Sequence, residues 1–197
     1  MSTHSVRQPA AADREDPDER AMTAVAKGDG EALRDIFDRW KLPILNYLYR
    51  SLGNHADAED LTLAVFTEVW RAAPRYRNEG TFSAWLFAIA RGKLRHEWRR
   101  QQRKPLLPAP AELMDIPDPD SGVEPDLEQW EWEETLLEGL QTLPENQRSA
   151  LLLSVHSPMD SREIAASLGI RPSHLYVLIH RARETLKKHF RKHHENR

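Results

Sequence analysis

The chain has 197 residues, of which 40% are hydrophobic and 30% charged, with a formal net charge of −3. These proportions are typical of a water-soluble protein, and at this length we expect two small hydrophobic cores in preference to one large core. The chain has no cysteine, which excludes disulfides and thiolate-bound zinc or iron–sulfur sites. The N-terminal segment lacks the apolar core of a signal peptide, and the longest apolar run, 84–90, is far too short to span a membrane. We therefore expect a cytoplasmic protein without membrane insertion.

The N-terminal part of the chain is predicted to form a tail followed by two helices. Residues 1–19 mix Pro, Ala and acidic side chains without periodicity, so we expect them to be disordered. From Arg20 apolar side chains recur at helical spacing up to Gly53, a residue type that commonly ends helices. Pro43 lies inside this stretch and predicts a kink or a split in the second helix.

A third helix is predicted over residues 55–72, before Pro74, and it has two apolar faces. One face carries Ala58, Leu61, Val65 and Val69, and the other carries Leu63, Phe66 and Trp70. A small domain buries two such faces only when the helix lies at its centre. The alternatives are therefore a central helix of a bundle and a helix that docks a partner.

A fourth helix is predicted from about Phe82 to Gln102, and basic residues follow one side of it. Arg91, Arg95, Arg99 and Arg103 recur at steps of four residues. On an α-helix such steps drift by only about 40° each, so the four guanidinium groups form one slanting row. Such a row is suited to the phosphates of a nucleic acid.

The middle of the chain has the composition of a linker. Residues 105–125 contain six prolines, five acidic side chains and no Lys or Arg, so we expect them to be extended and flexible. Helical spacing resumes near Asp126 and continues past Pro144, and no strand-like alternation occurs along the chain. The predicted fold class is all-α, with two small helical domains, 20–104 and 126–197, joined by this acidic linker.

The last predicted elements, between Asp160 and Phe190, have the spacing of a helix-turn-helix. Ala165 permits a close helix crossing, Gly169 permits the positive φ of a tight turn, and the segment from Asp160 to Glu163 forms an N-terminal cap. In the second helix the inward stripe consists of Leu175, Leu178, Ile179, Ala182 and Leu186. The outward side chains suit a DNA major groove, and a helical hairpin with solvated charges is the alternative.

Charge is strongly segregated along the chain. Residues 105–147 have twelve acidic side chains and no Lys or Arg, whereas residues 91–104 have seven Lys or Arg against one acid and residues 171–197 have eight against two. Two basic segments with an acidic spacer between them predict two salt-sensitive contacts with a polyanion. Chance clustering of charge in a helical protein is the alternative.

Four segments, in this order, resemble the extracytoplasmic-function sigma factors, the small members of the bacterial sigma-70 family. DAEDLTLAVFTEVW at 57–70 is similar to the helix of sigma domain two that docks core RNA polymerase. EGTFSAWLFAIARGKLRHEWRR at 79–100 is similar to the adjoining helix that recognises and melts promoters. LQTLPENQRSALLLS at 140–154, and SREIAASLGI at 161–170 followed by HRARETL at 180–186, are similar to sigma domain four.

The resemblance implies an alternative sigma factor whose partners are core RNA polymerase and promoter DNA. An anti-sigma factor is a further kind of partner that the resemblance suggests. Domain two would hold the polymerase and capture the melted minus-ten element, and domain four would read the minus-thirty-five element as duplex. The expected polymerase contacts are Asp57, Glu59, Asp60, Leu61, Leu63, Phe66 and Trp70. The expected minus-ten contacts are Arg75, Tyr76, Arg77, Asn78, Trp85, Arg91, Arg95 and Arg99. The expected minus-thirty-five contacts are Arg171, Ser173, His174, Tyr176, Val177, His180, Arg181 and Arg183.

Two aromatic residues of domain two are candidates for stacking on melted bases, which contributes roughly 1–3 kcal/mol per base. For Trp85, packing in the core is the favoured alternative to stacking. Tyr76 lies in the loop before the fourth helix and is the better candidate.

The sequence departs from the family pattern in three places. Leu63 and Ala64 replace a polar pair, Gly92 replaces Asn, and Tyr176 and Leu178 replace Lys and Arg. These changes predict altered polymerase docking, a lost polar contact to melted DNA and an unusual minus-thirty-five sequence. Phosphorylation of Thr62 or Thr67 is a hypothesis for restoring negative charge at the docking face.

Two rival functions stay open at this point. A conventional helix-turn-helix regulator would bind a palindromic site as a dimer without polymerase. A degenerate sigma would occupy polymerase without reading DNA. We expect no enzyme and no cofactor, because the sequence lacks a nucleophile–base pair and a phosphate loop. A metal site at His189, His193 and His194 is disfavoured, because only Glu195 accompanies them.

Overall fold

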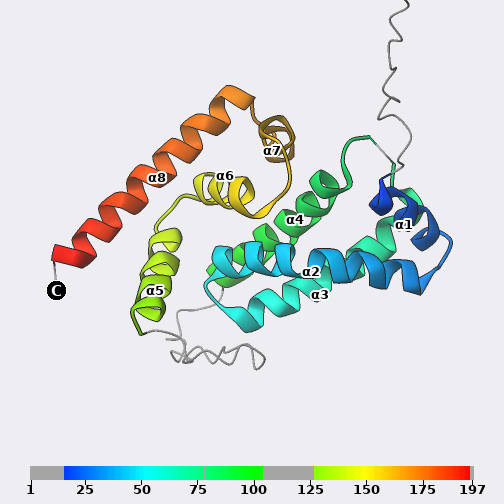
Figure 1. Ribbon diagram of the computed structural model, residues 1–197, viewed down its shortest axis with the longest axis horizontal. Helices are drawn as coiled ribbons and strands as arrows, with labels where there is room; N and C mark the ends of the chain where they lie inside the picture. Colours follow the sequence, from blue (N-terminus) through cyan, green and yellow to red (C-terminus); the bar gives the residue numbers. More distant parts are fainter. Residues whose placement is uncertain (1–15, 78, 104–126, 196–197) are drawn as a thin grey trace, which may run out of the picture.

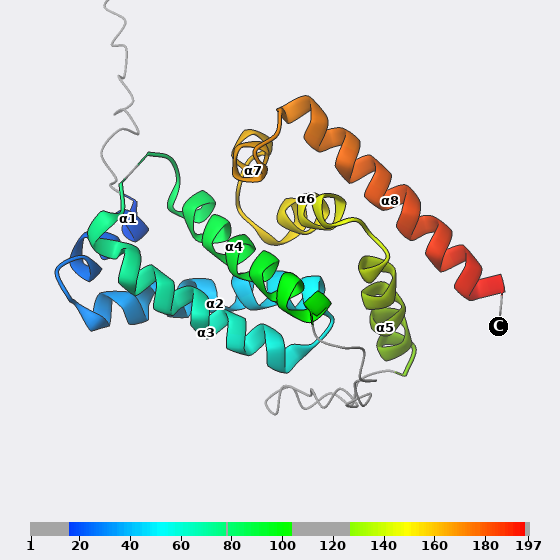
Figure 2. The same ribbon diagram turned by 180° about the vertical axis from the view of Figure 1, so that it is seen from behind.

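The computed structural model describes residues 16–77, 79–103 and 127–195 (Figures 1 and 2). Every regular element in these ranges is a helix, which confirms the predicted all-α fold class. Most of the predicted tail and all of the predicted linker 105–125 lie outside the described residues. No helix in the described ranges is long and apolar enough to cross a membrane.

The N-terminal domain is a four-helix arrangement in which α2 packs against α1 and α3, and α3 packs against α4. Its helices are α1 (Pro17–Val25), α2 (Gly30–Leu52), α3 (His55–Ala72) and α4 (Phe82–Arg103), with a short 3-10 turn η1 (Ala73–Arg75). Pro43 does not split the second helix, because α2 continues through it. Gly53 ends α2 in the left-handed conformation, with φ of 74°.

Helix α1 begins at Pro17, so the last three residues of the predicted disordered tail, 17–19, are helical. Asp16 caps it by accepting a hydrogen bond from the Asp18 backbone N–H at 2.9 Å. The Asp18 carboxylate is buried and accepts hydrogen bonds from Arg39 Nε and Trp40 Nε1, both at 3.0 Å. These partners lie on α2, so the local composition that predicted disorder gives no sign of them.

The C-terminal domain is built around a long last helix that packs against the three helices before it. Its helices are α5 (Leu127–Gln141), α6 (Glu145–His156), α7 (Ser161–Leu168) and α8 (Pro172–Glu195). The capping box predicted at the start of α7 is present, with Asp160 and Glu163 bonded reciprocally. Gly169 adopts φ of 69° at the turn, and Ala165 is fully buried at the helix crossing. The predicted helix-turn-helix is confirmed.

The two domains pack against each other. Helix α2 contacts α5 and α6, and α4 contacts α7. The buried apolar side chains of both domains form one cluster, so the chain has one continuous core in place of two separate small ones. Figures 1 and 2 show α8 on the outer side of this assembly, away from α1 and α3.

Candidate nucleic-acid and partner interfaces

One side of α3 presents apolar side chains to solvent. Leu63 is 59% exposed and Trp70 is 40% exposed. A spacing of seven residues places these two side chains on one stripe, with Asp60 and the exposed Thr67 beside them. We call Asp57, Glu59, Asp60, Leu63, Thr67 and Trp70 the α3 surface. It combines the exposed apolar groups and the acidic groups predicted for polymerase docking.

Two residues predicted on this side of α3 lie inside the protein. Phe66, a predicted polymerase contact, is 4% exposed, and its ring lies 4.8 Å from that of Phe37 in an edge-on arrangement. Phe66 therefore shapes the core and does not present its ring to a partner. Thr62 is 5% exposed and donates its hydroxyl to the Ala58 carbonyl at 2.7 Å. The phosphorylation hypothesis is wrong for Thr62 in this fold, whereas Thr67 is exposed.

A hollow of about 420 Å³ lies between the loop after η1 and the start of α4. It is lined by Arg75, Tyr76, Arg77, Glu79, Gly80, Thr81, Ala84 and Trp85. The rings of Tyr76 and Trp85 meet edge-on at 4.8 Å, so Trp85 both packs against its neighbour and borders the hollow. Burial raises the pKa of Tyr76, and Glu19 nearby adds to the shift. Asn78 lies outside the described residues.

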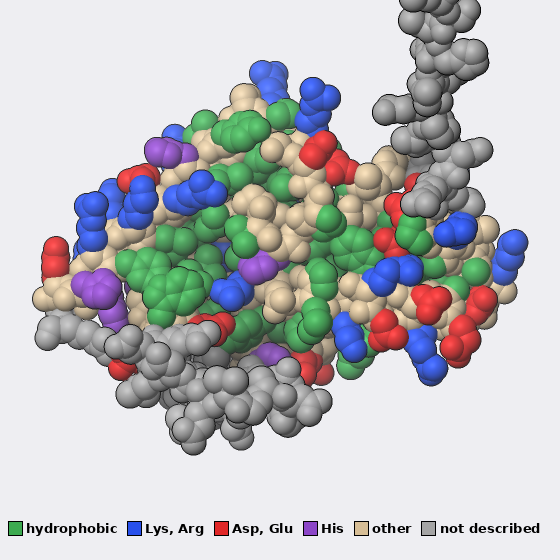
Figure 3. Space-filling view, viewed as in Figure 1, with side chains coloured by type: hydrophobic (Ala, Val, Ile, Leu, Met, Phe, Trp, Pro, Cys, Tyr) green, Lys and Arg blue, Asp and Glu red, His purple; other side chains and the backbone are tan. Residues whose placement is uncertain are grey.

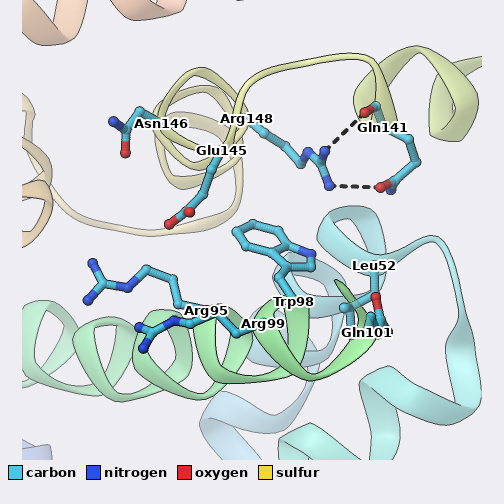
Figure 4. A pocket seen from close by; sticks show the side chains of 9 residues that line it. All are labelled: Leu52, Arg95, Trp98, Arg99, Gln101, Gln141, Glu145, Asn146 and Arg148. Carbon is cyan, nitrogen blue, oxygen red and sulfur yellow. Dashed lines mark hydrogen bonds between the residues drawn. The ribbon is translucent and has the colours of Figure 1, made fainter. Parts of the chain in front are cut away.

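Part of the arginine row of α4 faces the C-terminal domain. Arg95 and Arg99 border a cleft of about 760 Å³ between α4 and α6. In Figure 4 Glu145 extends from α6 towards these two arginines. Arg91 is half-buried, and desolvation lowers its pKa. The side chain of Arg103 lies outside the described residues. Two of the predicted minus-ten contacts thus lie opposite another part of the same chain.

The same cleft contains a buried arginine that the sequence analysis missed. Arg148 is 8% exposed, and burial lowers its pKa. Its Nη1 donates to the Ser51 carbonyl of α2 at 2.6 Å and to Gln141 Oε1 at 2.7 Å. Its Nη2 donates to the Gln141 and Leu143 carbonyls, both at 3.1 Å. Figure 4 shows the bonds between Arg148 and Gln141. The guanidinium carbon lies 5.2 Å from the centre of the Trp98 ring.

Arg148 therefore joins the two domains through groups from both. A second contact between domains is the hydrogen bond from Thr81 Oγ1 to the Glu163 carboxylate. Arg50 and Glu133 form a further ion pair between domains at 3.7 Å. Nothing in the spacing around these residues predicts their partners, which lie 82 to 97 positions away.

The outer side of α8 is open and basic. All eight predicted minus-thirty-five contacts are exposed: Arg171, Ser173, His174, Tyr176, Val177, His180, Arg181 and Arg183. No acidic residue occurs between positions 171 and 183. Figure 3 shows Lys and Arg side chains gathered along this helix. We call this set the α8 outer face.

The C-terminal histidines pack towards α5. His193 Nε2 lies 3.4 Å from the Thr135 hydroxyl, and His189 Nε2 lies 3.9 Å from the Glu138 carboxylate. Within the described ranges no group of three or more His, Cys, Asp or Glu is placed to hold a metal ion.

Comparison with known proteins gives the family. Residues 36–104 match the model of Sigma-70 region 2, and residues 133–186 match the model of Sigma-70 region 4. The RNA polymerase sigma factor CarQ of Myxococcus xanthus is 33% identical, over 85% of this chain and 94% of its own length. The ECF RNA polymerase sigma factor SigE of Mycolicibacterium smegmatis is 31% identical, over 91% of this chain and 71% of its own length. The chain is an extracytoplasmic-function sigma factor of the sigma-70 family.

Solved structures agree with this sigma factor in fold. CnrH in complex with the cytosolic domain of CnrY is similar with a TM-score of 0.64 and 24% identity, over 88% of this chain and 96% of that one. RpoE of Bartonella quintana in complex with the anti-sigma factor NepR is similar with a TM-score of 0.58 and 19% identity, over 80% of this chain and 98% of that one.

Family membership confirms the resemblance to the extracytoplasmic-function sigma factors. This sigma factor directs transcription initiation and is not an enzyme. The match to region 2 covers α3 and α4, which a conventional helix-turn-helix regulator would not need. Helix α8 continues for nine residues beyond the region 4 match.

Proposed function

We propose that this sigma factor binds core RNA polymerase through the α3 surface and reads the minus-thirty-five element with the α8 outer face. The hollow beside Tyr76 and the arginine row of α4 bind the melted minus-ten element. The protein acts in the cytoplasm, where the polymerase is. The α8 outer face is the observation that carries this proposal.

The α8 outer face has the charge and the shape that duplex DNA requires. Over 13 positions it presents three arginines, two histidines and no carboxylate, with every arginine and histidine exposed on α8 or at the residue before it. A single α-helix fits the major groove of B-DNA, and side chains at its N-terminal end reach base edges. Each Lys or Arg that neutralises a phosphate releases counterions and makes binding salt-dependent.

The α3 surface has the composition of a protein interface. Exposed Leu and Trp side chains surrounded by charged groups form the usual core and rim of such an interface. Leu63 and Trp70 would provide the buried centre, and Asp57, Glu59 and Asp60 the polar rim.

The minus-ten element requires groups that hold unpaired bases. The hollow beside Tyr76 offers aromatic edges with Arg75 and Arg77 at its rim, both exposed. Stacking on an aromatic face contributes roughly 1–3 kcal/mol per base. Arg95 and Arg99 would bind the phosphates that follow, after domain four moves away from the cleft.

The test is promoter-dependent transcription with purified core polymerase and the full chain on genomic fragments. Leu63→Glu is expected to weaken binding to core polymerase by at least about tenfold, because an interface centre tolerates no buried charge. Leu42→Glu is the matched control, since Leu42 on α2 has the same exposed fraction of 59%.

Failure of the full chain to bind core polymerase would overturn the proposal, as would equal effects of the two variants. A chain that binds core polymerase but produces no run-off transcript would be a degenerate sigma, which occupies polymerase without reading DNA.

A further inference from the structure

Two apolar side chains lie exposed within the α8 outer face. Tyr176 is 61% exposed and Val177 is 42% exposed. Their neighbours on the helix surface are charged or polar. Neither side chain is needed to close the core, which is formed by the opposite side of the helix.

The geometry places Val177 at the centre of the α8 outer face. Positions four apart lie on one side of a helix, so Ser173, Val177 and Arg181 share a stripe. Val177 and Ser173 also border a hollow of about 530 Å³ at the N-terminal end of α8, together with Arg171 and His174. Side chains around this hollow therefore surround Val177 with hydrogen-bond donors and positive charge.

Tyr176 is held beside this stripe. Its hydroxyl donates to Ser161 Oγ at 3.2 Å, which ties the ring to the start of α7. A ring fixed in this way adds exposed apolar surface to the α8 outer face at little cost in side-chain entropy.

An aliphatic side chain has no group that can hydrogen-bond to a base edge. The apolar group that the major groove presents is the C5-methyl of thymine, and contact with it distinguishes thymine from the other bases. We propose that Val177, with Tyr176 beside it, determines promoter preference by contacting thymine methyl groups in the minus-thirty-five element. This inference rests on the proposed function of the α8 outer face.

Uracil provides the direct probe, because it differs from thymine in this element by the methyl group alone. The preferred upstream sequence is first selected from a library of randomised duplexes with the full chain assembled on core polymerase. Each thymine of the selected element is then replaced by uracil, one at a time. Replacement at a contacted position is expected to weaken binding about fourfold, equivalent to ~0.8 kcal/mol for one buried methyl-sized group.

Two variants assign the effect to its residue. In Val177→Ser the ratio of binding affinities for the thymine and uracil duplexes is expected to fall below about twofold, because the aliphatic contact is lost. Val155→Ser is the matched control, since Val155 is 63% exposed but lies on α6. This control is expected to keep the full thymine preference.

Three results would overturn the inference: a selected element without thymine on either strand, equal binding of thymine and uracil at every position, or unchanged thymine preference in Val177→Ser. These outcomes leave the proposed function intact, because they still include selection of an upstream sequence. A holoenzyme that selects no upstream sequence would instead contradict both proposals.

Discussion

The α8 outer face and the arginine row of α4 have similar chemistry but different surroundings. Both present arginines from one side of a long helix. The α8 outer face is open to solvent, with Arg171, Arg181 and Arg183 all exposed. Arg95 and Arg99 are also exposed, but they border a cleft whose opposite wall is α6 of the same chain.

This difference indicates that the two surfaces need different steps to reach DNA. A duplex can approach the α8 outer face in the structure as it is. Under the proposed function, DNA would reach Arg95 and Arg99 after α6 moves away, and the Arg148 contacts with Ser51 and Trp98 hold α6 in place. Buried charges with good hydrogen bonds resist separation, because each would lose its partners on opening.

The largest expected effect is on the binding of duplex DNA by the isolated chain, where the two arginine sets should differ. Substituting Arg181 and Arg183 by Ala is expected to weaken binding to a duplex that carries the preferred element by roughly 100-fold at 50 mM salt, since the proposed function assigns both side chains to phosphate contacts. The same change at Arg95 and Arg99 is expected to alter this binding by less than about threefold. Fluorescence anisotropy over a salt series measures both.

When the chain is assembled on core polymerase, we expect the substitutions at Arg95 and Arg99 to have a large effect as well. There the Arg95 and Arg99 double variant is expected to lose open-complex formation, which permanganate reactivity of unpaired thymines detects. Equal losses from both double variants in the isolated chain would contradict the difference between the two surfaces.

A smaller effect is expected from loosening the cleft. Trp98→Ala removes the ring beside Arg148 and is expected to lower the free energy of unfolding by about 2 kcal/mol, because the ring is partly buried and contacts a desolvated cation. The domains should also separate more often. Urea denaturation measures the first change, and the radius of gyration from solution scattering measures the second.

Trp70→Ala is the control for the cleft variant, since Trp70 lies on the solvent side of α3 and is 40% exposed. It is expected to leave the radius of gyration unchanged. If the Trp98 variant is as compact as the unmodified chain, the ring does not help to hold the domains together.

The smallest expected effect concerns pH. Burial lowers the pKa of His156 below its ordinary value of 6.5, and the charge of Arg50 from the other domain adds to the shift. Below pH 6.5 the unfolded chain therefore binds this proton more readily than the folded chain, so stability falls as the pH decreases. The midpoint temperature of thermal unfolding should be lower at pH 5.5 than at pH 7.5. This decrease should be smaller in His156→Gln than in the unmodified chain.

His180→Gln is the matched control for this pH dependence, since His180 is exposed on α8. It should retain the full decrease on acidification. An identical decrease in His156→Gln would mean that other groups cause it.

The sequence by itself determined the elements whose signals are local. Helical spacing predicted α3 and α4 to within one residue, and the Asp160 to Glu163 cap and Gly169 indicated the helix-turn-helix. The outward side chains of α8 were predicted correctly, since a helix with one apolar stripe must turn its other side to solvent. The family resemblance also followed from local segments.

Only the tertiary structure decided features that depend on residues far apart in the chain. Phe66 is buried because Phe37 of α2 lies against it, and Asp18 is buried because α2 supplies two donors. The burial of Arg148 likewise depends on a carbonyl 97 positions earlier. Periodicity records which side of a helix is apolar, but a contact between two helices depends on where both lie in space, and that is set by the packing of the whole core.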